Sequence, residues 1–221
     1  VHAIGGALGD VADLIRGGLD TTDAWIQEHI GIKQRYIASE EQATSDLGVL
    51  AAQRALAAAS ISAEEVDLTI CATSTPDHPL PSTAGLIQAR LGCRGGAFDL
   101  NAVCSGFVYA LTTAFALHAT GRYRNILVVG ADTYSKILDC RDRKTVVFFG
   151  DGAGAVVVGP AKATSLLAAA EGSDGSRAQH IIVPAGGSRR PATPQRLLNG
   201  EGWFYMDGRA VWNFVSECFP K

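Results

Sequence analysis

Residues 97–121 have the sequence AFDLNAVCSGFVYALTTAFALHATG, in which a short apolar run passes directly into a long one. Residues 97–101 have the length and composition of a buried strand. Residues 105–120 predict a helix that ends at Gly121, because glycine readily adopts the left-handed conformation found just after a helix. The stretch therefore predicts a strand, a sharp turn at Cys104 and a helix, as in layered α/β proteins.

The sequence on both sides of this stretch repeats the alternation of strands and helices. Apolar residues recur at helical spacing through residues 45–59, and a β-rich apolar run follows at 67–73. The proline-rich loop 74–81 leads to Ser82, a good helix cap, and to a helix that ends near Gly92. Further strands are expected at 1–8, 125–131, 145–149, 153–159 and 180–183, a short helix within 20–30, and mainly loops over 172–202. This alternation predicts a sheet with helices on both faces.

The composition argues against several classes of protein. The chain has 221 residues, of which 47% are hydrophobic, and a formal net charge of −3, so nothing favours binding to nucleic acid or to an anionic membrane. The purely apolar runs are too short to span a bilayer, and the sequence begins without the pattern of a secretory signal. We therefore expect a cytoplasmic protein with no membrane segment.

The five cysteines form no C-x-x-C pair and no cluster with the five histidines that has the spacing of metal ligands. No metal site is therefore expected. An odd number of cysteines in a reducing compartment indicates free thiols. Most free cysteines are small buried hydrophobic residues, so a functional cysteine needs a position that sets it apart.

Cys104 has such a position, because it lies between the predicted strand and the predicted helix. The positive end of a helix dipole favours the thiolate form of a cysteine. The unpaired N–H groups of the first helical turn could also stabilise an oxyanion when the thiolate attacks a carbonyl. Gly106 would allow the chain to approach closely there. The layout resembles the nucleophile elbow with sulfur in place of oxygen, and the alternative is a buried structural cysteine.

Other candidate motifs are weaker. Residues 150–154 are glycine-rich, but they lack both the G-K-[ST] ending and the G-x-G-x-x-G spacing of nucleotide-binding loops. They predict instead a tight turn between the strands 145–149 and 153–159. Trp25 would ordinarily belong to a core and Arg143 to the solvated surface. Asp77 and His78 could form an acid–base pair, although a simply polar loop is the commoner case. No G-x-S-x-G motif supports a serine hydrolase.

Taken together, the segments resemble the β-ketoacyl-acyl-carrier-protein synthase III family. The resemblance runs in order from about residue 20 to the end of the chain, and the active-site segment FDLNAVCSGF at 98–107 is its centre. The other matching segments are DTTDAWI at 20–26, TSDL at 44–47, PSTA at 81–84, FGDGAGA at 149–155 and MDGR at 206–209. No single segment is decisive, but the ordered set is highly specific.

The resemblance implies a mechanism and a substrate. Cys104 would take an acyl group from coenzyme A or from an acyl carrier protein, and the acyl-cysteine would then condense with a malonyl-type thioester. Such an acyltransferase starts a fatty-acid or polyketide chain and needs no further cofactor. By resemblance, Trp25 and Arg143 would sandwich the adenine of coenzyme A, and Thr21 would lie nearby.

The resemblance also implies a fold and an assembly. It implies the thiolase-like fold, with layers α-β-α-β-α, of which residues 1–160 would form the N-terminal half and residues 161–221 the region leading into a second half outside this sequence. Gly208 and Arg209 would line the pantetheine tunnel. Leu80 matches a position that closes the acyl pocket of a neighbouring subunit, so the resemblance implies a homodimer.

The sequence departs from the family at several points, and one of them is near its start, where Gly9 runs directly to Asp10 and the family has a proline-containing loop. None of its histidines lies in the family's His-Gln-x-Asn pattern, which belongs to the second half, and His29 replaces a common arginine near the coenzyme A phosphates. An acyltransferase of the same fold that forms no carbon–carbon bond therefore stays open as an alternative. A non-catalytic partner subunit is less favoured because Cys104 is present, and a plain nucleotide-binding α/β domain is the least favoured.

Overall fold

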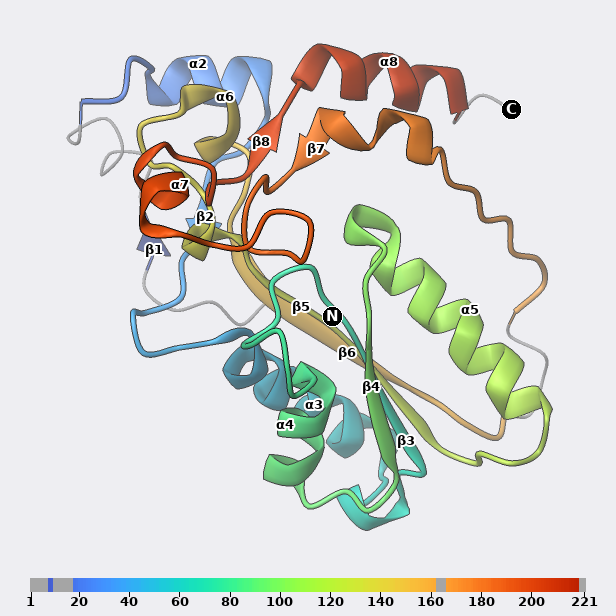
Figure 1. The fold of residues 1–221 in the computed structure, drawn as a ribbon. Coiled ribbons are helices and arrows are strands. Elements are labelled where there is room, and N and C mark those ends of the chain that lie inside the picture. The colour runs from blue at the N-terminus through green and yellow to red at the C-terminus, as the bar shows by residue number, and fades with distance from the viewer. Residues whose placement is uncertain (1–7, 10–17, 162–165, 219–221) are drawn as a thin grey trace. The chain divides into compact units, whose positions relative to one another are not determined.

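The computed structural model describes residues 8–9, 18–161 and 166–218 (Figure 1). The chain forms two compact units whose segments alternate along the sequence. Of the described residues, the first unit contains 8, 36–133, 150–161 and 166–171, and the second contains 9, 18–35, 134–149 and 172–218. Two-residue strands, β1 (Leu8–Gly9) and β2 (Arg35–Tyr36), lie where the chain passes between the units. The strand predicted at 1–8 falls almost entirely outside the described residues.

The first unit is built on a four-stranded mixed sheet. Its strands are β3 (Leu68–Ala72), β4 (Gly96–Leu100), β5 (Ile126–Thr133) and β6 (Asp151–Val158), in the order β4-β3-β5-β6. The central strand β3 runs parallel to both neighbours, with Cys71 opposite Asp99 on one side and Val129 on the other. β6 runs antiparallel to β5. All five residues of β3 are buried, as expected of a strand covered on both faces.

Helices cover both faces of this sheet, as the sequence predicted. α3 (Thr44–Ala59) and α4 (Thr83–Leu91) lie on one face, and α5 (Gly106–Ala119) lies on the other (Figure 1). Short 3₁₀ turns, η1 (Ala63–Glu65) and η2 (Val103–Ser105), precede β3 and α5. The first face buries Leu47, Ala52, Ile87, Leu127 and Val129, and the second buries Ile70, Ala110, Ala114, Ile126 and Val128. The first unit is therefore a three-layered α-β-α structure.

The second unit consists of short elements. Its helices are α2 (Asp23–His29), α6 (Arg143–Val146), α7 (Pro194–Leu198) and α8 (Gly208–Cys218), with 3₁₀ turns η3 (Tyr134–Lys136) and η4 (Gly175–His180). Two short strands, β7 (Ile181–Ile182) and β8 (Tyr205–Met206), pair antiparallel. One small core contains Ile26, Val146 and Val147, and another contains Tyr134 and Phe204.

Two predictions between residues 145 and 152 are wrong. The expected strand 145–149 is instead the end of the one-turn helix α6 and the residues that follow it. The Asp142 side chain caps this helix by accepting hydrogen bonds from the Lys144 amide and the Thr145 hydroxyl, at 3.0 and 2.8 Å. The expected tight turn at 150–152 is also absent, because Asp151 and Gly152 already belong to β6 and pair with Thr133 and Asp132.

The segment 172–202 has more regular structure than the sequence predicted. It contains η4, β7 and α7, where loops around one strand were expected. Thr193 caps α7 through its hydroxyl, and Pro194 stands in the first turn, where its missing N–H is harmless. Within the described residues, every helix is too short or too polar to cross a bilayer.

Candidate active site

Cys104 lies on a strained turn between the end of β4 and the start of α5. The residue before it, Val103, has a φ of 49°, which is rare for a β-branched side chain and costs on the order of 1–3 kcal/mol. The Asn101 side chain helps to hold this conformation, because its Oδ1 accepts a hydrogen bond from the Val103 amide at 3.2 Å. The turn thus has the strained strand-to-helix geometry expected of a nucleophile elbow, and the Cys104 thiol is exposed.

The 3₁₀ turn determines which amides could stabilise an oxyanion. The amides of Ser105 and Gly106 already donate to the carbonyls of Ala102 and Val103. Within the described residues, the amide of Cys104 itself has no hydrogen-bond partner, which makes it the available donor of the turn.

The expected role of Gly106 is not supported. A Cβ added at Gly106 would lie 3.5 Å from the Ala72 Cβ, an ordinary van der Waals separation. The backbone therefore does not need glycine for a close approach at this position, and the sharp turn arises from the conformation of Val103 instead.

The other cysteines differ from Cys104 in burial or in setting. Cys71 is buried in the middle of β3, and desolvation raises the pKa of its thiol far above the ordinary value, with the nearby Asp99 carboxylate adding to the effect. Burial also raises the pKa of Cys93. Cys140 and Cys218 are exposed like Cys104, but Cys140 lies in the turn between η3 and α6, and Cys218 is the last residue of α8.

A second group of candidate residues surrounds the indole of Trp25 in the second unit. The guanidinium carbon of Arg143 lies 4.5 Å from the centre of the Trp25 ring, a cation–π arrangement. The His29 ring stacks on the same indole at 4.7 Å with an interplanar angle of 13°. Its Nδ1 lies 3.0 Å from the Trp25 carbonyl oxygen, and Asp20 lies 4.0 Å from Arg143. Trp25 and Arg143 are thus brought together from distant parts of the sequence, not separated into core and surface.

Local sequence explains how these side chains are positioned. The Thr22 side chain caps α2 by accepting a hydrogen bond from the Trp25 amide, and Ile26 anchors the helix in a core with Val146 of α6. Arg143 is the first residue of α6. The hydroxyl oxygen of Thr21 is buried and has no hydrogen-bond partner among the described residues. The unpaired hydroxyl of Thr21 lies four residues before Trp25 in the chain, and together with the contact between Trp25 and Arg143 it marks this part of the second unit as a candidate ligand site.

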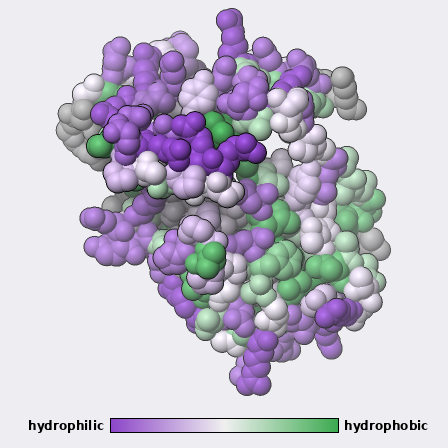
Figure 2. Space-filling view, in the orientation of Figure 1, coloured by the Kyte–Doolittle hydropathy of each residue, from purple (hydrophilic) through white to green (hydrophobic). Residues whose placement is uncertain are grey.

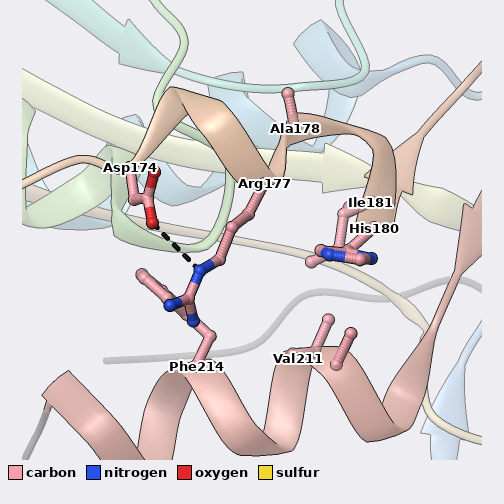
Figure 3. A pocket seen from close by; sticks show the side chains of 8 residues that line it. Asp174, Arg177, Ala178, His180, Ile181, Val211 and Phe214 are labelled. Carbon is pink, nitrogen blue, oxygen red and sulfur yellow. Dashed lines mark ion pairs between the residues drawn. The ribbon is translucent and has the colours of Figure 1, made fainter.

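Gly208 and Arg209 form the first turn of α8, which the Asp207 side chain caps by accepting from the Ala210 amide at 3.0 Å. The same helix lines a cavity of about 150 Å³, shown in Figure 3, between η4 and the apolar side chains of Val211 and Phe214. Arg177 spans it and forms ion pairs with Asp174 and Glu217, with its guanidinium over the Phe214 ring. These partners already satisfy the Arg177 guanidinium, and the described lining residues Val211 and Phe214 give the cavity an apolar wall.

Three carboxylates hold the loop that follows β3, a role that the sequence analysis assigned to none of them. Asp77, Asp99 and Asp132 accept hydrogen bonds from backbone amides in and around this loop. Asp77 bonds the amide and hydroxyl of Ser45, and its role is therefore structural and not that of an acid–base partner of His78. Leu80, at the tip of the loop, is 82% exposed.

Apolar side chains gather on the surface over β4 and α5 of the first unit (Figure 2). Phe98, Val103 and Val108 are all more than one-third exposed, and they flank Cys104 along the chain. Exposed apolar residues therefore precede and follow Cys104 in the chain. Among the described residues, no group of three or more potential ligands could hold a metal ion.

Comparison with known proteins identifies the family that shares this arrangement. Residues 98–175, from the Cys104 segment to the first residue of η4, match the family described as 3-oxoacyl-[acyl-carrier-protein (ACP)] synthase III. A solved 3-oxoacyl-(acyl-carrier-protein) synthase III is 33% identical with a TM-score of 0.87, over 99% of this chain and 68% of its own. The chain belongs to the β-ketoacyl-[acyl-carrier-protein] synthase III family.

Further similar proteins belong to the same family. The β-ketoacyl-[acyl-carrier-protein] synthase III of Caldanaerobacter subterraneus subsp. tengcongensis is 46% identical over 92% of this chain and 62% of its own length. The solved 3-oxoacyl-[acyl-carrier-protein] synthase III from Aquifex aeolicus VF5 is 38% identical, with a TM-score of 0.82, over 96% of this chain and 64% of its own. The chain thus spans about 62% of the curated relatives' length, and its fold is the N-terminal part of the thiolase-like fold.

Proposed function

We propose that the protein is an acyl-thioester condensing enzyme that initiates fatty-acid or polyketide synthesis through Cys104. The observation that carries the proposal is an exposed cysteine on a strained strand-to-helix turn, in a chain of the synthase III family. A solved priming β-ketosynthase of a polyketide pathway shares the fold at a TM-score of 0.86 and 29% identity.

The chemistry proceeds in two steps at Cys104. The thiolate attacks the carbonyl of an acyl thioester, the Cys104 amide stabilises the oxyanion, and the donor thiol leaves to give an acyl-cysteine. A malonyl-type thioester then loses carbon dioxide, and the electron pair left on its α-carbon attacks the acyl-cysteine carbonyl. Collapse of that adduct expels the Cys104 thiolate and releases a β-ketoacyl thioester, so the enzyme is regenerated.

The acyl donor is coenzyme A bound at the Trp25 surface, or an acyl carrier protein. The contact between Trp25 and Arg143 supports the first donor, because the adenine would stack between these two groups once Arg143 has moved outward, with Thr21 as a polar neighbour. Gly208 and Arg209 lie along the pantetheine, where a glycine leaves space for the ligand chain. Replacement of the expected arginine by His29 weakens the interaction with the coenzyme A phosphates and favours the carrier protein.

The groups that stabilise the enolate during decarboxylation are proposed to lie in the part of the relatives that this chain does not match. Within the described residues, His118 is occupied by the Tyr123 carbonyl, 2.9 Å from its Nδ1, and His29 stacks on Trp25. We place the boundary of the N-terminal half at residue 160, with residues 161–221 leading to the second half. The enzyme is further proposed to be a cytoplasmic homodimer in which Leu80 closes the acyl pocket of the other subunit.

The test is the intact mass of the natural full-length protein after incubation with a panel of acyl-coenzyme A thioesters and acyl carrier proteins. We expect the mass of one acyl group on Cys104, no such adduct in Cys104→Ala, and an unchanged adduct in the control Cys140→Ala, another exposed cysteine. Addition of malonyl-acyl-carrier-protein should convert the adduct into a β-ketoacyl product. Transfer to a hydroxyl or amine without loss of carbon dioxide would instead identify an acyltransferase, and an adduct on Cys140 would overturn the proposal.

A further inference from the structure

The loop between β3 and α4 presents a leucine at an exposed and stiff tip. The four residues from 78 to 81 are exposed, and Leu80 keeps 82% of its surface accessible. Pro79 and Pro81 flank it and fix φ at two of the four positions. A solvent-exposed leucine held on a stiff tip is suited to contact an apolar group with a defined position.

Hydrogen bonds hold the first part of this loop. The Oδ1 atom of Asp132, on β5, accepts from the amides of Ser74 and Thr75 at 2.9 and 3.2 Å, and from the hydroxyl of Thr75 at 3.0 Å. The Thr75 side chain is 7% exposed and also accepts from the Thr133 amide at 2.8 Å. The loop therefore leaves the sheet from a buried base that is fixed to the neighbouring strand.

Asp77 holds the loop just before the tip. Its two carboxylate oxygens accept from the amide and the hydroxyl of Ser45, in the first turn of α3, at 2.8 and 2.7 Å. Its own amide donates to the Thr83 hydroxyl at 3.1 Å. Asp99 in turn fixes the start of α4, because its carboxylate accepts from the amides of Thr83 and Ala84, both at 2.7 Å. The tip is thus fixed on both sides, and Asp77 is the bonded residue closest to Leu80 on its N-terminal side.

We propose that Asp77 is a positioning residue. By fixing the backbone of the β3–α4 loop it fixes the position of the Leu80 side chain, and so it limits the length of the acyl chain that Cys104 accepts. The inference rests on the proposed function, in which Leu80 closes the acyl pocket of a second copy. A leucine that blocks the end of a pocket excludes longer chains only while its backbone cannot retreat. Asp77 prevents this movement of the backbone because it is bonded to Ser45, a buried residue in the first turn of α3, and α3 packs in the core of the first unit.

The test measures selectivity between acyl chains in the natural full-length protein. Rates of Cys104 acylation are followed by intact mass with acetyl-coenzyme A and octanoyl-coenzyme A, and the ratio of the two rates is compared between variants. Asp77→Ala should raise the octanoyl-to-acetyl ratio by about tenfold, the scale at which pocket length discriminates between substrates. Asp77→Asn keeps an acceptor for the Ser45 amide and should restore a ratio close to that of the wild type.

Asp67→Ala is the matched control for general loss of stability. The Asp67 carboxylate also accepts from two loop amides, those of Arg124 and Asn125 at 2.7 and 3.0 Å, but it lies at the opposite end of β3. This variant should lose thermal stability without a change in the ratio. Leu80→Ala should raise the ratio as Asp77→Ala does, and the double variant should add little, because both act through one side chain.

The outcomes separate the inference from the function on which it rests. Acylation of Cys104 with an unchanged ratio in Asp77→Ala, or with the same rise in Asp67→Ala, would overturn the positioning role and leave the proposed function intact. Fully additive effects in the double variant would overturn it as well. Absence of acylation in the wild type with every donor would refute the proposed function, and the inference would fall with it.

Discussion

Binding of coenzyme A should depend more on Trp25 than on Arg143, because the space between them is too narrow for an adenine. The guanidinium carbon lies 4.5 Å from the centre of the indole ring. A purine stacked on both groups needs a separation of about 7 Å, twice the roughly 3.5 Å contact distance between carbon atoms. Arg143 must therefore move outward by about 2.5 Å, the difference between the two distances, and give up its contact with Trp25.

The displacement of Arg143 determines how much binding free energy each of the two side chains contributes. Stacking of a base on an aromatic side chain contributes about 1–3 kcal/mol, so Trp25→Ala should weaken binding by roughly 5- to 150-fold. Arg143 gains a stack on the adenine but loses a cation–π contact worth about 0.5–1 kcal/mol at an exposed site. Its ion pair with Asp20 spans 4.0 Å at the surface and adds little to the cost of moving. Arg143→Ala should consequently weaken binding by less than about tenfold.

Isothermal titration of the full-length protein with coenzyme A measures both effects. Arg143→Lys is the control, because it keeps the charge and loses the planar surface, and it should behave like Arg143→Ala. Acetyl-pantetheine lacks the adenine, so its binding should be the same in all variants. Wild-type affinity for coenzyme A in Trp25→Ala, or equal loss of acetyl-pantetheine binding, would refute the adenine site at this surface.

Three further predictions follow from the first unit. Iodoacetamide at neutral pH should label Cys104 and leave the buried Cys71 and Cys93 unmodified until the protein unfolds. Peptide mapping identifies the labelled cysteines. Labelling of Cys71 in the native protein would contradict its burial. Because burial raises the pKa of Cys71, the folded state keeps a proton that the unfolded thiol releases above its ordinary pKa of 9.0. Unfolding free energy should therefore fall by up to about 1.4 kcal/mol per pH unit from pH 9 to 11, and denaturant titrations of Cys71→Ala should show a smaller slope. Gly95→Ala should lower the melting temperature of the protein strongly, because the added Cβ would lie 2.1 Å from the Asp67 carbonyl oxygen. Gly106→Ala should change the melting temperature little. Equal melting temperatures of the two variants would contradict this prediction.

The layered fold of the first unit could be predicted from sequence because its strands and helices are separate apolar blocks. β3 and α5 each bury residues at the spacing of one element type, so local pattern and tertiary structure agree. Residues 145–149, TVVFF, have the composition of a strand but adopt a helical turn. Two facts outweigh local propensity there: Asp142 caps the turn, and Val146 and Val147 pack in a core with Ile26, more than one hundred residues away in sequence.

The candidate site was predictable to the extent that its chemistry lies in neighbouring residues. Cys104 could be recognised because a strand, a turn and a helix follow one another around it. The pairing of Trp25 with Arg143 could not be derived from the residues, because it depends on how α2 and α6 pack, and resemblance to the family alone suggested it. The backbone strain at Val103 could not be predicted from the sequence either, because a valine gives no local signal for a φ of 49°.

The carboxylates that hold the β3–α4 loop could have been expected from the hydroxyl residues of the loop itself. Thr73, Ser74 and Thr75 follow a fully buried strand, and hydroxyl groups that leave a core need acceptors. Their acceptor is Asp132, 57 to 59 residues later, where β5 ends next to β3. A run of hydroxyl residues after a buried strand therefore predicts an acidic residue near the end of the adjacent parallel strand. The same argument gives Asp77 its role, because an acidic residue beside the first turn of α3 satisfies amides that the helix itself leaves unpaired.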